Sequence, residues 1–294
     1  MRVNKNSGYL VPAGFTFFLV MLFSLSSLAD FRLPILFPVE KEVMVDEGAS
    51  EDLLSRLTKI DGLSLEVQMS EGNMMRDILL ERLNRLLKGV KKKIVLSGKV
   101  KRVHVEQLKK LDRFEVAWHS NGQKMDNETF TSLYELGPVR KYIEFPQGMK
   151  TNDLVLLKHM KFYTPVIVLG NKPVGKTLVD WLVNTNHKRV RFVLSAGFPT
   201  DKLYDLCRFK SISIEVETQN NTVPTNLLNV LKDLRGVEIE FVVDGRLTLE
   251  NVQAMTILDR FSLKIQLDNP PDYTPGLINM LNEIAPPSVL RSKP

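Results

Sequence analysis

The sequence is poor in the residues that build covalent or metal-centred sites. It contains one cysteine, Cys207, in 294 residues, so no internal disulfide can form. The four histidines are scattered, and none has the spacing of a metal-binding motif such as HExxH. The motifs GxSxG, SxxK and CxxC are absent as well. These absences argue against a disulfide scaffold and against several common hydrolase families, and we expect no metal and no other cofactor.

The composition shows no strong bias. Hydrophobic residues make up 44% of the chain and charged residues 25%, which is typical of a folded protein. The formal charge is +6, with acidic and basic residues interspersed. One dense basic run, Lys88–Lys93, continues at Lys99, Lys101 and Arg102 with no aromatic residues between. A nucleic-acid groove needs stacking rings as well as charge, so we interpret the run as a solvated helix end and expect no nucleic-acid partner.

The first 29 residues have the pattern of an export signal. Two basic residues precede an uncharged stretch with the apolar core Phe15–Phe23, and the small residues Ser27 and Ala29 stand just before the expected cleavage point. A bilayer-spanning helix needs about 20 apolar residues, which the same stretch can nearly supply. The sequence therefore predicts a periplasmic or secreted protein, and the alternative is a membrane anchor formed by residues 9–29.

Most of the chain reads as a repeat. Residues 30–60 contain two prolines and an acidic run, and we interpret them as an irregular linker or cap. From 61 to 289 a strand, a polar turn and a helix recur about every 25 residues, followed by a short tail at 290–294. The nine predicted strands centre on Leu65, Val95, Val116, Ile143, Ile167, Phe192, Ile214, Ile239 and Ile265.

Alternating strands and helices with short links predict an α/β fold with a parallel sheet and right-handed crossovers. Two architectures fit: an open solenoid and a small (βα)8 barrel. In most predicted strands one face is apolar and the other charged, as in Ile212, Ile214 and Val216 against Ser213, Glu215 and Glu217. Charges without partners inside a closed barrel are costly, whereas an open concave sheet leaves them in water. The alternation therefore favours the open solenoid.

The period and the alternation between about Gly62 and Ile284 resemble those of leucine-rich-repeat proteins, although the consensus LxxLxLxxNxL does not recur. This resemblance implies binding through the concave sheet face, as solenoids commonly bind. The candidate binding residues on that face are mostly acidic: Glu66, Glu115, His119, Glu144, Arg191, Glu215, Glu238, Glu240 and Lys264.

A second candidate is a phosphate-binding loop. Gly170 to Thr177 match GxxxxGK[ST] between a predicted strand and a predicted helix. In such a loop Gly170 and Gly175 would let backbone N–H groups surround phosphates, Lys176 would neutralise their charge, and Thr177 would bind Mg²⁺. Neighbouring repeats have similar turns without the motif, so a structural turn is the simpler interpretation.

The sequence thus predicts an exported, non-catalytic repeat protein. Its expected partner is a protein of the envelope or extracellular space, bound through the acidic concave face. The first alternative is an exported (βα)8-barrel hydrolase that uses strand carboxylates as acid and base. The second is a nucleotide-binding protein that uses Gly170, Gly175, Lys176 and Thr177.

Overall fold

A computed structural model describes residues 39–71, 74–145, 156–184, 189–206, 209, 211–267 and 275–284. These residues belong to one compact unit, Ile35–Pro294. The predicted export signal, the tail at 290–294 and Cys207 lie outside the described residues, as does the side chain of Thr177.

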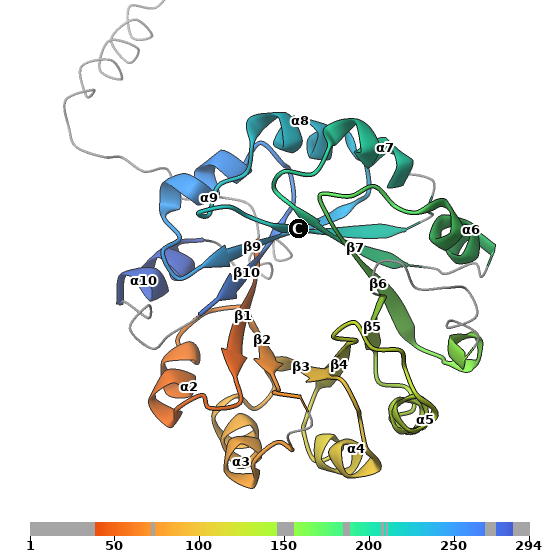
Figure 1. Cartoon of the computed structure of the whole chain (residues 1–294). Helices are drawn as coiled ribbons and strands as arrows, with labels where there is room; N and C mark the ends of the chain where they lie inside the picture. Colours follow the sequence, from red (N-terminus) through yellow and green to blue (C-terminus); the bar gives the residue numbers. More distant parts are fainter. Residues whose placement is uncertain are drawn as a thin grey trace, which may run out of the picture. The chain divides into compact units, whose positions relative to one another are not determined.

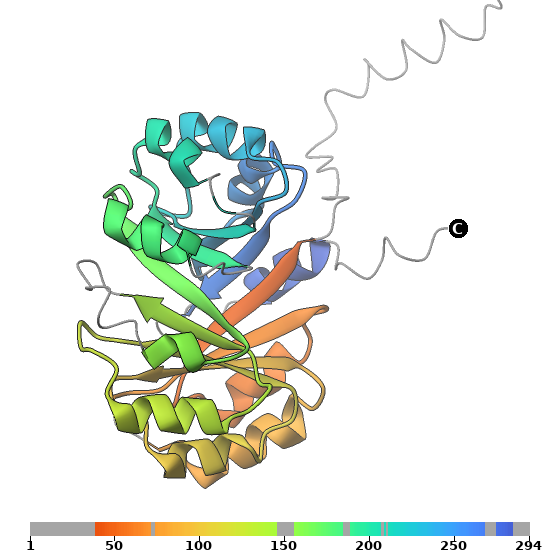
Figure 2. The same ribbon diagram turned by 90° about the vertical axis from the view of Figure 1, so that its right-hand side faces the viewer.

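Strands and helical segments alternate along the described chain (Figures 1 and 2). The strands are β1 (Glu40–Asp46), β2 (Leu63–Gln68), β3 (Lys91–Ser97), β4 (Phe114–His119), β5 (Lys141–Phe145), β6 (Tyr163–Gly170), β7 (Val190–Ser195), β8 (Ile212–Glu217), β9 (Glu238–Asp244) and β10 (Ser262–Gln266). The α-helices are α2 (Glu51–Leu57), α3 (Asp77–Leu86), α4 (Arg102–Leu108), α5 (Asn127–Glu135), α6 (Lys176–Asn184), α7 (Leu203–Leu206), α8 (Thr225–Asp233), α9 (Leu249–Met255) and α10 (Pro275–Glu283). Two 3₁₀ segments complete the set: η2 (Leu156–His159) and η3 (Thr200–Lys202).

The ten strands close into a parallel barrel, with the helices outside it (Figure 1). Closure is made by β1, which pairs in parallel with both β2 and β10; Val43 lies opposite Leu65 on one side and Ile265 on the other. The prediction of an open solenoid, and with it the leucine-rich-repeat resemblance, is therefore wrong. The barrel alternative agrees with the structure, but with ten strands where eight were predicted.

The sequence did not predict a closed barrel because the first strand and helix, which complete it, were not recognised. Residues 40–57 form β1 and α2, whereas the sequence was interpreted as irregular there. The start of β1, Glu-Lys-Glu, was counted as part of an acidic run, although Lys41 and Glu42 are buried. The nine strands predicted downstream are all present, each containing its predicted central residue.

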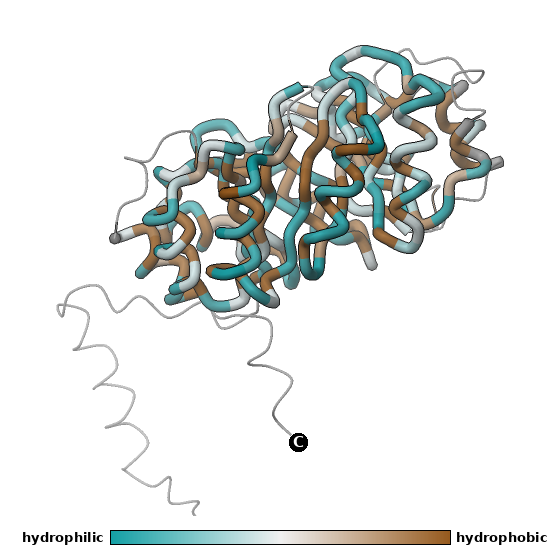
Figure 3. The backbone as a smooth tube through the Cα atoms, turned by 90° about the horizontal axis from the view of Figure 1, so that it is seen from below, coloured by the Kyte–Doolittle hydropathy of each residue, from teal (hydrophilic) through white to brown (hydrophobic). Residues whose placement is uncertain are grey.

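Apolar and polar residues alternate along the strands as predicted, but the polar face of each such strand points into the barrel. Apolar residues such as Leu65, Ile214 and Ile265 face outward and are at most 1% exposed beneath the helices. Their polar neighbours face the interior, and apolar and polar segments accordingly alternate along the backbone in Figure 3. The argument against a barrel failed because these charges have partners of opposite sign across the interior.

Three fully buried lysines on outward strand positions donate hydrogen bonds to backbone carbonyls of the turns at the amino-terminal end of the barrel. The Lys92 ammonium donates to the carbonyls of Leu87 and Val90 at 2.9 and 3.0 Å. That of Lys141 donates to the carbonyls of Gly137 and Val139, both at 2.8 Å. These carbonyls end or follow a helix, where no intrahelical donor remains for them.

Lys41 does the same across the closure, donating to the Ile284 carbonyl at the end of α10 at 2.8 Å. Burial, partly offset by the charge of Asp61, lowers the pKa of Lys41 to about 8. Burial alone lowers the pKa of Lys141 to about 8 as well. None of the helices in the described part of the chain has the length and apolar character that a bilayer crossing needs.

Candidate functional site

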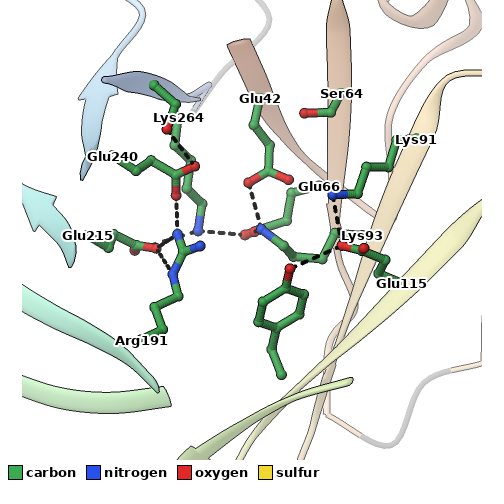
Figure 4. Close-up of polar contacts among 12 residues, drawn as sticks. Glu42, Ser64, Glu66, Lys91, Lys93, Glu115, Arg191, Glu215, Glu240 and Lys264 are labelled. Carbon is green, nitrogen blue, oxygen red and sulfur yellow. Dashed lines mark hydrogen bonds and ion pairs between the residues drawn. The ribbon is translucent and has the colours of Figure 1, made fainter. Parts of the chain in front are cut away.

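A network of ion pairs fills the middle of the barrel (Figure 4). The Arg191 guanidinium, on β7, contacts the carboxylates of Glu215 on β8 and Glu240 on β9, and its Nε donates to Glu215 at 3.1 Å. The three side chains are 11–16% exposed. Arg191 therefore bridges neighbouring strands in a setting that is largely withdrawn from water.

Two lysines extend the network around the barrel. Lys93 Nζ, on β3, lies 2.6 Å from Glu42 and 3.0 Å from Glu66. Lys264 Nζ, on β10, lies 3.0 Å from Glu66 and 3.7 Å from Glu215. Seven strands thus share one electrostatic unit, which is possible only because the barrel is closed.

The carboxylates of the network differ in how easily they ionise. Burial alone would raise the pKa of Glu66, but Lys93 and Lys264 outweigh it and lower this pKa to about 2. For Glu42 burial prevails over the attraction of Lys93, and repulsion from Glu240 and Glu66 adds to it, so its pKa is raised. The network holds four carboxylates and three cations (Glu42, Glu66, Glu215, Glu240; Lys93, Arg191, Lys264). With every group ionised the network carries one excess negative charge, which favours protonation of Glu42.

The amino-terminal end of the barrel holds two further carboxylates that form ion pairs. Glu115 is approached by Lys91 at 3.0 Å and by Arg140 at 3.5 Å. Glu238 is exposed and pairs with Arg189. The structure thus divides the predicted binding residues into three groups. Glu66, Arg191, Glu215, Glu240 and Lys264 are enclosed in the network, Glu115 and Glu238 lie at the amino-terminal end, and His119 and Glu144 lie at the carboxyl-terminal end.

Apolar residues that face inward at the carboxyl-terminal end of the barrel are only partly buried. Met44, Val168 and Val242 face inward near the ends of β1, β6 and β9 and are partly exposed, whereas their outward-facing neighbours on the same strands are buried. A barrel of eight strands is just wide enough for side chains to fill, and ten strands enclose more space. We call this partly exposed inner surface, formed by Met44, Val168 and Val242, the barrel mouth.

Carboxylates surround the barrel mouth. Glu144, at the end of β5, accepts a hydrogen bond from the Ser120 hydroxyl at 3.3 Å and lies 3.7 Å from Nδ1 of His119. Asp244, at the end of β9, is held by Asn221 at 2.7 Å and by Arg246 at 2.6 Å. These two carboxylates therefore already have neutral or basic neighbours.

Glu217 is different. It ends β8 on the inward face, two residues after Glu215, and its side chain is exposed in the barrel mouth. Within the described residues its carboxylate makes no hydrogen bond or ion pair. Loss of hydration in the mouth and then repulsion from Glu215 raise its pKa. A carboxylate with a raised pKa at the carboxyl-terminal end of a barrel strand is a functional-site candidate.

The Gly170–Thr177 segment connects β6 to α6 at the same end of the barrel. Gly170 has a φ of 55°, which glycine adopts without strain, and α6 begins at the exposed Lys176. The strand–turn–helix setting is as expected, but α6 is one of several helices that start at this end. Phosphate binding there stays a prediction.

Sequence reasoning missed Glu42, Lys93 and Glu217 as members of these groups. Glu42 was assigned to a linker, and Lys93 to a solvated helix end. Glu217 was recognised as lying on the polar face of its strand but was not singled out. Among the described residues, no group of three or more His, Cys, Asp and Glu side chains is arranged to hold a metal ion.

No protein-family model matches this sequence, and no curated protein matches it. The functional interpretation therefore rests on the geometry of the barrel.

Proposed function

We propose that this protein is a binding protein that accepts a lysine or arginine side chain of a protein partner in its barrel mouth. The observation that carries the proposal is Glu217, an exposed carboxylate that makes no ion pair within the described residues and whose pKa is raised by burial and Glu215, although the more distant charge of Lys264 opposes that rise. This proposal keeps the acidic binding face predicted from the sequence but moves it from a concave sheet to the end of the barrel.

The chemistry of the mouth suits a long basic side chain. Such a side chain has an aliphatic stem and a charged head, and it packs the stem on apolar surface while the head stays polar. Met44, Val168 and Val242 offer apolar surface for the stem. Glu217 offers a carboxylate for the head, and a nearby positive charge favours its ionised form.

The test is calorimetric titration of the full chain with an acetylated pentalysine peptide. We expect binding that weakens about tenfold in Glu217→Gln, since an ion pair of about 1.4 kcal/mol corresponds to that factor. The matched control is Glu238→Gln, an exposed glutamate at the opposite end of the barrel, which should bind as the wild type does. Equal affinities of the two variants would refute the proposal.

A second candidate function is hydrolysis, and the raised pKa of Glu217 favours it. A carboxyl group with a raised pKa can act as a general acid, and Glu144, at the same end of the barrel, would be the base or nucleophile. Cleavage of glycosides or esters by the wild-type chain, abolished in both Glu217→Gln and Glu144→Gln, would support this function. The absence of turnover on a broad substrate panel would leave the binding proposal standing.

Export of the protein, periplasmic or secreted, remains a proposal that rests on residues 1–29, as does the alternative of an anchor at residues 9–29. Determining the amino-terminal residue of the mature protein tests it. Cleavage after Ala29 is the expected result.

A further inference from the structure

We propose that the amino-terminal end of the barrel binds an anionic lipid surface. This surface lies opposite the barrel mouth, and its argument is independent of the function proposed there. Two features carry the inference: an excess of basic residues in the connections from helices to strands, and one exposed aromatic residue in a strained conformation among them.

The basic excess is larger at this end of the molecule than at the other, where the described connections hold six basic residues and three acidic ones. In the described connections that lead into the strands, ten basic residues stand against three acidic ones. The basic residues are Lys59, Lys88, Lys109, Lys110, Arg113, Arg140, Lys161, Arg189, Arg235 and Arg260, and the acidic ones are Asp61, Asp112 and Asp259.

Six of the basic residues lie in four consecutive connections, those before β3, β4, β5 and β6. We call them the basic arc: Lys88, Lys109, Lys110, Arg113, Arg140 and Lys161. Two hydrogen bonds show that these connections lie side by side. The Arg113 guanidinium donates to the Gly89 carbonyl at 2.8 Å, and Val116 N–H donates to the Arg140 carbonyl at 3.0 Å.

The acidic residue within the basic arc is already neutralised. Asp112 pairs with the buried Lys92 at 2.5 Å and accepts a hydrogen bond from the Gly89 N–H at 2.7 Å. The side chains of Lys88, Lys110 and Lys161 are exposed, and none makes an ion pair within the described residues. Their charge is therefore available to a partner.

Phe162 stands at the end of the basic arc, next to Lys161. Its side chain is 61% exposed, the largest fraction among the exposed large hydrophobic residues of the described chain. Its φ is 59°, a left-handed conformation that is costly for a bulky residue. The Phe162 side chain does not contribute to the core. Phe162 contacts the barrel through its backbone, where its carbonyl accepts a hydrogen bond from the Lys141 N–H at 2.9 Å.

A lipid headgroup region fits both features. Lysines and arginines near an anionic bilayer gain affinity from its negative surface potential, and an aromatic ring gains from partial insertion at the interface. Nucleic acid fits less well, because strand-tracking grooves combine charge with several stacking rings, and among the described residues of these connections Phe162 is the one exposed ring.

Vesicle flotation with the full chain tests the inference. The vesicles contain phosphatidylcholine alone or phosphatidylcholine and phosphatidylserine in equal parts. Because any binding through residues 9–29 occurs with both, the informative quantity is the ratio of the two affinities. Each basic residue near the surface contributes about fivefold. The triple variant Lys88→Gln, Lys110→Gln, Lys161→Gln should therefore lower the affinity for the anionic vesicles on the order of a hundredfold.

Phe162→Gly separates a binding role from a structural one. Glycine adopts a φ of 59° without strain, so this variant should be at least as stable to urea as the wild type while binding anionic vesicles more weakly. The matched charge control is Lys99→Gln with Lys172→Gln at the opposite end, which should leave the ratio unchanged. Equal binding of the wild type to both vesicles, or binding of oligonucleotides in place of vesicles, would overturn the inference.

Discussion

The Lys41 ammonium on the first strand donates a 2.8 Å hydrogen bond to the carbonyl of Ile284 at the end of the last described helix, 243 residues away. This contact joins the two ends of the repeat at the place where β1 and β10 pair. It is buried, so its loss leaves a carbonyl without water to replace the donor.

We therefore expect Lys41→Met to lower the free energy of unfolding by about 1–3 kcal/mol, the cost of an unsatisfied buried polar group. The folded pKa of Lys41 lies below that of unfolded lysine, so the wild type gains stability as the pH rises from about 8 toward 10. Lys41→Met should show a smaller gain, because only the contribution of Lys141 remains. Urea unfolding at pH 7 and pH 9.5 measures both effects, and the exposed Lys59→Met is the control.

Closure of the barrel can be tested with a short cross-link. Met44 on β1 and Gln266 on β10 are register neighbours, and both face inward at the carboxyl-terminal end. In a Cys207→Ser background, Met44→Cys with Gln266→Cys should be joined rapidly by dibromobimane, because neighbouring strands lie about 4.8 Å apart. The same variant in urea and the two single variants serve as controls. Cross-linking no faster in the folded chain than in urea would contradict closure.

The ion network should be sensitive to the loss of one member. Arg191→Ala leaves Glu215 and Glu240 inside the barrel without their main partner, and such losses cost about 3–5 kcal/mol. Arg189→Ala, two residues away, removes a pair with the exposed Glu238 and should cost less than about 1 kcal/mol. Urea denaturation compares the two. Similar losses would mean that the interior pairs are solvated like those at the surface.

The contributions of Glu66 and Glu42 to stability should change with pH in opposite directions. The folded pKa of Glu66 is lowered to about 2, so its stabilising contribution is present above the unfolded pKa of about 4.3 and is lost as the pH falls from about 5 toward 2. The folded pKa of Glu42 is raised, so its contribution is present below the unfolded pKa and is lost as the pH rises through the folded one.

This contrast gives a matched pair of variants. At pH 7 we expect Glu66→Gln to destabilise the protein by about 3 kcal/mol, as a pKa shift of more than two units implies. Glu42→Gln should destabilise the protein less than Glu66→Gln does, since the raised pKa of Glu42 means that its ionised form is less favoured in the barrel. Unfolding by urea between pH 3 and pH 8 checks both signs. A large destabilisation by Glu42→Gln at pH 7 would show that this carboxylate is ionised in the barrel.

Local pattern was enough to predict the downstream strands and, in most of them, which side is apolar. It was not enough to predict what the polar side meets. Glu215 and Arg191 are 24 residues apart, and Glu66 and Lys264 meet only once the barrel is closed. The alternating sequence pattern of a strand is the same whether its charged face lies in water or pairs with opposite charges across an enclosed space.

The candidate site was harder to predict for the same reason. Glu215 and Glu217 stand on the same face of the same strand, yet one is in the network and the other is exposed in the mouth. Their difference arises from depth along the barrel axis, which depends on the stagger between strands and on the number of strands that close the barrel. Neither quantity is encoded in a single strand.

The most direct test of the binding account is the titration of the Glu217 side-chain carboxyl carbon by NMR, with and without saturating acetylated pentalysine. The account predicts a raised pKa in the free protein that falls when the peptide binds, since a cation in the mouth favours the ionised carboxylate. A Glu217 pKa that is the same in the free and the peptide-bound protein would contradict it.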